Sequence, residues 1–286
     1  MDPVGDRPLD RELVEIDRPT TDRRGRVAAG VLAAIAIAAA AWYFWPERVR
    51  PAAPTTGAVL SETRASPSAA ARAPLGPEVQ QGPLPPLDET DPMVRQLLGA
   101  LSSHPQVAAW LATDGLVRQF VAAVDNVATG TTPARHMKVL APPDPFEARP
   151  QGGRTVISER SFARYDALAE AVAEIDPSAL AVLYARLRPR LQEAYVELGN
   201  PAGHVDAAVG QAIVHLLETP VPELPVEVEP GVLSFKFREE RLERLSAAQK
   251  QLVRMGPRNM RRVQSQLWAV GRELGIPTDR LGPVPE

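Results

Sequence analysis

An uncharged stretch near the N-terminus, Val27–Trp45, most constrains how this 286-residue chain can fold. It runs for 19 residues without Asp, Glu, Lys or Arg. As a helix it would be about 28 Å long, close to the hydrocarbon thickness of a bilayer, so the sequence predicts one transmembrane helix here. Trp42, Tyr43 and Trp45 close the stretch, where aromatic side chains prefer the membrane–water interface. Pro46 then ends the helix.

Flanking arginines give the expected helix a direction across the inner membrane. Arg18, Arg23, Arg24 and Arg26 precede it, and fewer arginines follow, which predicts a cytoplasmic tail at 1–26 and a C-terminal domain in the periplasm. Nine of the 19 residues are alanine, so insertion is only moderately favourable, and cleavage as a signal peptide stays open as an alternative. The long leader, with seven acidic residues, favours an anchor.

The stretch after the anchor is rich in Pro, Ala, Ser and Thr. Residues 46–83 have no apolar periodicity, so they cannot bury enough surface to offset the entropy of ordering, and we expect a disordered linker that acts as a tether. The chain has no cysteine, which excludes disulfides, thiolate metal sites and cysteine nucleophiles. A net charge of −3 does not favour a polyanion, and we expect no nucleic acid among the partners.

Helical spacing of apolar residues dominates positions 84–276. Asp91-Pro92 and Asp176-Pro177 each join a helix-capping side chain to a proline at the first helical position. Apolar residues then recur every three or four positions, and glycines end several of these stretches. The sequence therefore predicts a mainly α fold: a multi-helix globular domain at 84–276, preceded by the transmembrane helix and the linker and followed by a flexible tail at 277–286.

Two regions interrupt the helical pattern. Prolines exclude a helix between 131 and 157, where Phe146–Arg149 and Arg154–Ile157 flank two glycines and can pair as a small β-hairpin. Residues 220–237 are extended and partly alternating, which predicts one or two further short strands. Pro189 lies within a helical stretch and is expected to kink it.

Several blocks of the domain carry a family resemblance. The blocks are LPPLDETDP, SFARYDALAEAVAEID, LYARLRPRLQEAYVELG and LSAAQKQLVRMGPRNMRR. Together they resemble the bacterial envelope family catalogued as domain of unknown function 3014, over roughly residues 84–274. The resemblance implies a helical fold, an envelope location and the same order of anchor, linker and domain. It implies no activity and transfers no catalytic residue.

The catalytic and metal-binding motifs that we sought are not found in the chain. It has no GxSxG, HExxH or GxxxxGK[ST] sequence. His204 and His215 return to one helix face, but they lie about 16 Å apart along the axis and cannot share one zinc ion. We therefore expect no catalytic residue, metal or cofactor. An enzyme acting on cell-wall or lipid substrates, with a cleft lined by residues 164–166 and Glu193, stays open as an alternative.

The most distinctive chemical feature is a local excess of positive charge. Residues 236–262 include nine Lys or Arg and three Glu, a net charge of +6. Such an excess is typical of a solvated helix face, and it also suits contact with an anionic partner such as an acidic protein, lipid phosphates or a cell-wall polymer. The candidate interaction surface comprises Arg164, Tyr165, Asp166, Gln249, Lys250, Arg254, Arg258, Asn259 and Arg262.

A second interpretation of the same block is structural. Gln249 and Asn259 can bond backbone groups at Met255-Gly256-Pro257, which would make the block a helical corner and not a contact surface. The leading functional hypothesis is a non-catalytic interaction or scaffold domain that is tethered to the inner membrane and contacts an anionic or envelope protein partner.

Overall fold

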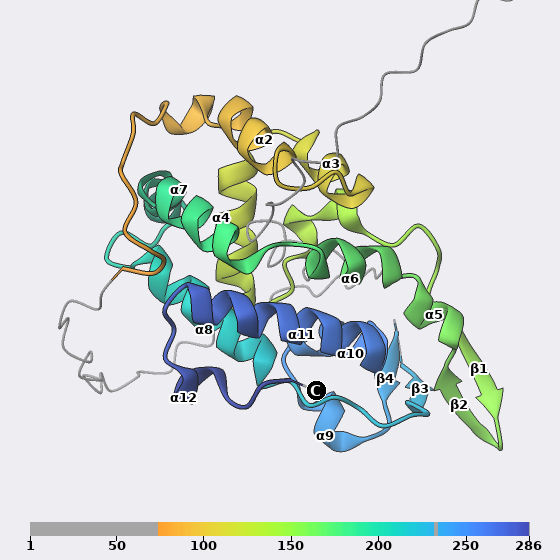
Figure 1. Cartoon of the computed structure of the whole chain (residues 1–286). Coiled ribbons are helices and arrows are strands. Elements are labelled where there is room, and N and C mark those ends of the chain that lie inside the picture. The colour runs from red at the N-terminus through yellow and green to blue at the C-terminus, as the bar shows by residue number, and fades with distance from the viewer. Residues whose placement is uncertain (1–73, 232–233, 286) are drawn as a thin grey trace, which may run out of the picture.

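Helices make up most of residues 74–231 and 234–285, which are the residues that this computed structural model describes (Figure 1). Three of the expected segments lie outside the described residues. They are the tail at 1–26, the transmembrane helix at 27–45 with Trp42, Tyr43 and Trp45, and residues 46–73 of the linker. They stay predictions.

The elements follow one another along the chain with short connections. The α-helices are α2 (Asp91–Gly99), α3 (Pro105–Leu111), α4 (Leu116–Ala128), α5 (Glu159–Ala163), α6 (Asp166–Ala173), α7 (Pro177–Glu197), α8 (Val205–Leu217), α9 (Glu240–Glu243), α10 (Ala247–Arg254), α11 (Gly256–Glu273) and α12 (Thr278–Leu281). The 3-10 turns are η2 (Leu87–Glu89), η3 (Ala134–His136) and η4 (Lys138–Leu140), and the strands are β1 (Ala148–Gln151), β2 (Arg154–Ile157), β3 (Val228–Pro230) and β4 (Phe235–Phe237).

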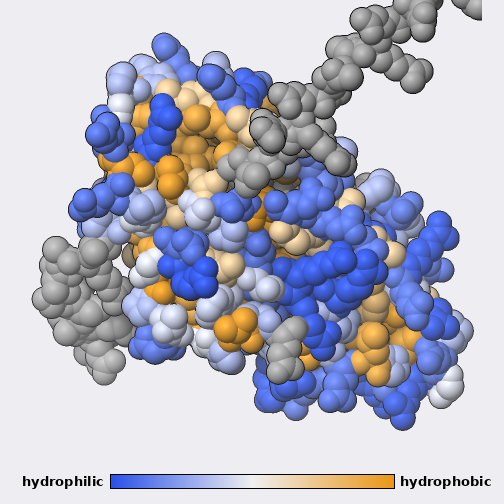
Figure 2. All heavy atoms as spheres, viewed as in Figure 1, coloured by the Kyte–Doolittle hydropathy of each residue, from blue (hydrophilic) through white to orange (hydrophobic). Residues whose placement is uncertain are grey.

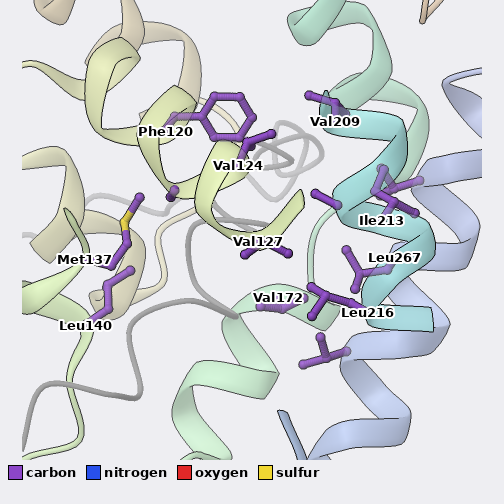
Figure 3. Close-up of a cluster of buried hydrophobic side chains, with 14 of the residues drawn as sticks. Phe120, Val124, Val127, Met137, Leu140, Val172, Val209, Ile213, Leu216 and Leu267 are labelled. Atoms are coloured by element: carbon purple, nitrogen blue, oxygen red, sulfur yellow. The ribbon is translucent and has the colours of Figure 1, made fainter. Parts of the chain in front are cut away.

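The core forms where α4, α8 and α11 meet. Helix α4 packs against α7 and α8, and α11 packs against α6, α7 and α8. Phe120 of α4, Ile213 of α8 and Leu267 of α11 are each fully buried in this core (Figure 3). Helix α8 is apolar on nearly every face, as expected of a helix surrounded by others.

Within the described part of the chain, no single helix is both long and apolar enough to cross a membrane. The pair α3 and α4 meets both criteria only when its members are joined, and they are bent by 110° at their junction.

The predicted hairpin is confirmed, with its first strand at Ala148–Gln151 where Phe146–Arg149 was expected, and the short strands predicted between residues 220 and 237 are β3 and β4. Strands β1 and β2 pair antiparallel, with Gln151 opposite Arg154 across the two glycines, and β3 pairs with β4. The Ile157 amide donates to the Val226 carbonyl at 3.0 Å, which links the two separate two-stranded sheets side by side next to α5 and α10. Figure 1 shows both hairpins at one end of the domain.

One of the two predicted proline-associated caps is confirmed, and the other serves a different helix. The Asp176 carboxylate accepts a hydrogen bond from the Ala179 amide at 2.7 Å and caps α7. This bond lowers the pKa of Asp176. The Asp91 carboxylate instead accepts from the amides of Gly115 and Leu116, at 2.7 and 2.9 Å. It therefore caps α4, because folding brings the start of that helix against the start of α2.

The folded domain also contains residues that the sequence assigned to the linker. Residues 74–86, called the strap here, lie along α7 and α8. The Leu75 amide donates to the Asp206 carboxylate at 3.2 Å, and the Arg188 guanidinium donates to the Leu75 carbonyl at 2.9 Å. The Gly76 amide bonds the Leu274 carbonyl at 2.9 Å. With φ of +86°, Gly76 adopts a conformation that favours glycine.

A glutamine of the strap bonds α7 at its proline. Pro189 has no N–H to bond the carbonyl four residues earlier, that of Ala185. The Gln81 side-chain amide donates to this carbonyl at 3.1 Å. The strap thus supplies the hydrogen bond that the helix itself cannot make.

The C-terminal residues are folded against the domain as well. Leu281 of α12 is 3% exposed, and the Trp268 indole donates to the Gly282 carbonyl at 3.1 Å. The domain therefore includes residues 74–83 and 277–285, beyond the predicted limits of 84 and 276. Each added segment is held by residues distant in sequence, which composition alone does not reveal.

Candidate interaction surface

The predicted surface residues come together where the α5–α6 junction meets the α10–α11 junction, a region called the corner here. Gly256 permits the sharp turn between α10 and α11 with φ of +81°. A Cβ at this position would lie 2.6 Å from the Phe162 ring, so the backbone of α11 approaches α5 closely. All nine predicted residues belong to these four helices or their junctions.

Asn259 faces into the corner. Its side chain is 2% exposed, and its amide nitrogen lies 3.1 Å from the Phe162 carbonyl, 2.8 Å from the Asp166 carboxylate and 3.2 Å from the Met255 carbonyl. One amide group therefore joins α5, α6, α10 and α11. Its oxygen Oδ1 is buried and has no hydrogen-bond partner among the described residues.

Gln249 faces inward as well and joins α10 to α8. Its Nε2 donates to the His215 carbonyl at 3.1 Å. Its Oε1 accepts from the Ser246 amide while the Ser246 hydroxyl accepts from the Gln249 amide, each at 3.2 Å, which completes a capping box at the start of α10. The His215 ring lies 2.8 Å from the same hydroxyl, and burial lowers the pKa of His215.

Tyr165 is buried at the α5–α6 junction, within the corner. It is 1% exposed, and its hydroxyl accepts from the Gln251 amide at 3.3 Å. Burial raises the pKa of Tyr165, and the nearby Arg164, Gln251 and Arg254 partly oppose this rise. Tyr165, Gln249 and Asn259 are therefore internal residues, and a partner on the surface of this structure does not reach them.

Three further buried amides of the same kind were not predicted from the sequence. The Gln264 side chain donates to the carbonyls of Leu216 and Thr219 at 3.1 and 2.9 Å, and that of Gln266 donates to Ile175 at 2.6 Å. The third is Gln251, described above. The sequence contained an indication that such amides are buried. Gln264 lies three residues before Leu267, and Asn259 lies four residues before Val263, so each amide shares a helix face with an apolar residue.

The charged members of the predicted surface are exposed or half-buried, and most have carboxylate partners. Arg258 lies 3.8 Å from Asp166, and Arg262 lies 3.3 Å from Glu170. Lys250 bonds both the carboxylate and the carbonyl of Glu243 at 2.9 Å. The net charge of +6 counted along the chain is therefore smaller in space, because Asp166 and Glu170 of α6, which lie outside residues 236–262, are beside two of these cations.

Arg164 differs from these residues, because aromatic rings and carbonyls hold it. Its guanidinium lies over the rings of Phe146 and Tyr165, with Cζ 5.8 and 5.1 Å from the two centroids. Nη1 donates to the Asp144 carbonyl at 2.7 Å and Nε donates to the Ser161 carbonyl at 3.0 Å. Among the ion pairs of the described residues, none includes Arg164.

A second arginine–aromatic contact adjoins the first. The Arg254 guanidinium lies 5.2 Å from the centroid of the Phe237 ring, and the rings of Phe146 and Phe235 lie 5.4 Å apart. The half-buried side chains of Phe146, Arg164, Phe235 and Arg254 are called the cradle here. On the face drawn in Figure 2, hydrophobic atoms appear among hydrophilic ones at the end of the domain that carries the hairpins.

The residues named for an enzymatic cleft are placed differently from that expectation. Tyr165 is internal, and Glu193 lies on α7, where it accepts a bond from Arg190. An open cavity of about 250 Å³ lies elsewhere, lined by Glu223, Pro225, Val226, Glu227, Arg238, Glu239 and Leu242. In the part of the chain that the structure describes, no three His, Cys, Asp or Glu side chains are grouped as metal ligands.

Comparison with known proteins adds one finding. A family model described as Protein of unknown function (DUF3014) matches residues 116–270, which include the corner and both hairpins. No curated protein and no solved structure matches the chain.

Proposed function

The chain belongs to the DUF3014 family, and from this premise and the geometry of the corner we propose that it is a non-catalytic interaction domain. In this proposal the expected helix at 27–45 tethers the domain to the inner membrane, with residues 1–26 in the cytoplasm and the domain in the periplasm. The cradle is the surface through which it contacts an anionic envelope partner.

One observation carries the proposal: the amides of the corner are internal, and they fix the elements that bear the cradle. Asn259 and Gln251 bond residues on α5 and at the α5–α6 junction, which carries Arg164. A binding surface gains affinity when its side chains are already held in place before the partner arrives. The inward amides therefore support both interpretations of the block, since a structural corner is also a rigid support for a surface.

The entry point of the chain supports the orientation. The strap meets the domain along α7 and α8, whereas the hairpins lie toward the opposite end (Figure 1). A tether that enters through the strap would leave the cradle directed away from the bilayer. This favours a partner in the envelope over the lipids of the same membrane.

A topology experiment tests the location. A reporter enzyme that is active only outside the cytoplasm is fused to the C-terminus, and a second reporter that is active only inside is fused at the same site. We expect activity from the first alone. Activity from the second alone would place the domain in the cytoplasm and end the proposal.

In-cell photo-crosslinking tests the contact surface. A photoreactive residue replaces Lys236, which is exposed and follows Phe235 on β4. Glu78, exposed in the strap, receives the same residue as a matched control. We expect a discrete crosslinked partner from position 236 and not from 78. Equal yields from both positions would contradict the assignment of the surface.

A further inference from the structure

We propose that Arg164 anchors a carboxylate-binding site in the cradle, and that its ligand is an acidic protein segment with an apolar side chain beside the carboxylate. This inference rests on the proposed function and names the partner class for the same surface.

The donors of Arg164 are only partly used. A guanidinium has five N–H groups. Nε bonds the Ser161 carbonyl, Nη1 bonds the Asp144 carbonyl and Nη2 bonds the Tyr165 hydroxyl at 3.4 Å. One N–H on each terminal nitrogen is left without an acceptor among the described residues. A carboxylate has two oxygens with which to accept them.

Arg164 is also held in place before any ligand binds. The rings of Phe146 and Tyr165 flank its guanidinium, and its two bonds to carbonyls fix the guanidinium plane. Less side-chain entropy is therefore lost on binding than for an arginine that extends into solvent. Arg254 lies near Tyr165 as well, since its charge, like that of Arg164, opposes the rise in the pKa of Tyr165.

The aromatic side of the cradle gives the ligand its second feature. Phe235 is half-buried and packs against Phe146, so an apolar group beside the bound carboxylate can cover part of its ring. Arginine and aromatic side chains are the residues that most often dominate binding energy at protein interfaces.

The charge pattern favours a peptide over a dense polyanion. Arg258 and Arg262 already lie beside Asp166 and Glu170, and these carboxylates would repel a membrane surface or a phosphate polymer. The surface therefore offers one anchoring cation among mixed charges. A single carboxylate on a protein segment matches that arrangement, whereas a polyanion needs a row of basic residues.

Peptide binding to the purified full chain in a non-ionic detergent tests the inference. The probe is a fluorescent hexapeptide with one Glu between two Phe residues, and its control replaces that Glu with Gln. We expect saturable binding of the acidic peptide, and Arg164→Gln should raise its Kd by about tenfold or more, the loss typical of a charged hydrogen-bonded pair. Arg261→Gln removes the same charge from an exposed residue of α11 and should change Kd by less than about twofold.

A conservative variant keeps the test independent of folding. Arg164→Lys retains the charge and stem but loses the planar fork, so it should still weaken binding several-fold, against Arg261→Lys as control. An unchanged Kd in a folded Arg164 variant overturns the inference. So does equal binding of the Gln peptide, or binding of inorganic phosphate or anionic vesicles in place of the acidic peptide.

The outcome is separable from that of the proposed function. If position 236 still crosslinks a partner in cells while the Arg164 variants bind the peptide normally, only the inference fails. If position 236 gives no specific crosslink, the proposed contact surface fails whatever the peptide does.

Discussion

The strap and the corner both join segments that are distant in the sequence, but they differ in how deeply the joining hydrogen bonds are buried. At both, polar side chains bond backbone groups of a segment far away in the sequence. The corner does so with the amides of Gln249 and Asn259, which are almost fully buried, and the equally buried Gln251 bonds the Tyr165 hydroxyl. The strap relies on the half-buried Arg188, Asp206 and an exposed Gln81. Hydrogen bonds that water can replace contribute less, so we expect the strap to open before the corner.

The family match divides the two regions in the same way. Residues 116–270 contain the whole corner, whereas the strap precedes them and only its docking residues on α7 and α8 fall inside. The comparison suggests a rigid unit with a separable attachment. Substitutions in either region should reveal this division, with the largest loss of stability at the corner.

Asn259→Ala should lower the free energy of unfolding by about 2–4 kcal/mol, because it removes a buried group that contacts three acceptors. Urea denaturation measures the change. Asn126→Ala is the matched control, since the Asn126 amide makes one longer bond, 3.4 Å to the Thr132 carbonyl, and should cost about 1 kcal/mol or less. If the two substitutions cost the same, the corner is no stronger than an ordinary surface contact.

Asp206→Ala should lower the free energy of unfolding by about 2 kcal/mol and make the strap sensitive to protease. The carboxylate bonds both the Leu75 amide and the buried Tyr184 hydroxyl. Asp176→Ala removes the N-terminal cap of α7, which the strap also contacts, and should cost about 1 kcal/mol without exposing the strap. Cleavage within residues 74–86 in both variants, or in neither, would argue against a locally opening strap.

Gln81→Ala should cost about 1 kcal/mol, and this cost should depend on Pro189. In a Pro189→Ala background the helix can bond the Ala185 carbonyl itself, so removing Gln81 should cost close to nothing. A double-mutant cycle by thermal unfolding measures the difference. Equal costs in the two backgrounds would mean that the bond from Gln81 does not compensate for the proline.

The smallest effect is a difference in pH response between the two regions. Burial lowers the pKa of His215 below 6.5, so the folded state binds fewer protons there, and the stabilisation present above pH 6.5 is lost as pH falls. Burial, then the Asp206 charge, raises the pKa of Tyr184 above 10.0, so the stabilisation present below pH 10.0 is lost as pH rises.

Acid should therefore disturb the α8–α10 contact first, and alkali should disturb the strap first. Amide chemical shifts of Gln249 and Leu75, followed by NMR across the pH range, report on the two regions separately. His215→Asn should remove most of the acid response at Gln249 and leave Leu75 unaffected. The same order of disturbance at both pH extremes would contradict the assignment.

The parts of the fold that sequence predicted are those set by neighbouring residues. The three-to-four spacing of apolar residues, the Asp176-Pro177 start and the glycine pair of the β1–β2 hairpin each act over a few positions. Asp91 shows the limit of this reasoning. Its carboxylate can cap any helix start within reach, and folding selected α4, whose first amides lie 24 and 25 residues further along the chain.

The candidate site was predictable in location but not in orientation. Both segments that build the corner were named, but for Gln249 and Asn259 the sequence left two interpretations open, a contact surface and a structural corner. Burial depends on whether a backbone partner faces the side chain, and those partners, Phe162 and His215, lie 97 and 34 residues away. Counting charge failed for the same reason, since Arg262 pairs with Glu170 at a separation of 92 residues.

The bonds of the strap also set the route by which mechanical force would enter the domain. Any pull transmitted through the chain before Pro74 meets Leu75 first, where Asp206 and Arg188 hold its amide and carbonyl. A pull away from α7 would break the bonds one after another, toward Gln81. When the bond from the Gln81 side chain breaks, the Ala185 carbonyl loses its hydrogen-bond donor, and α7 becomes less stable at Pro189. Tension on the chain would thus reach the longest helix of the domain before it reached the corner.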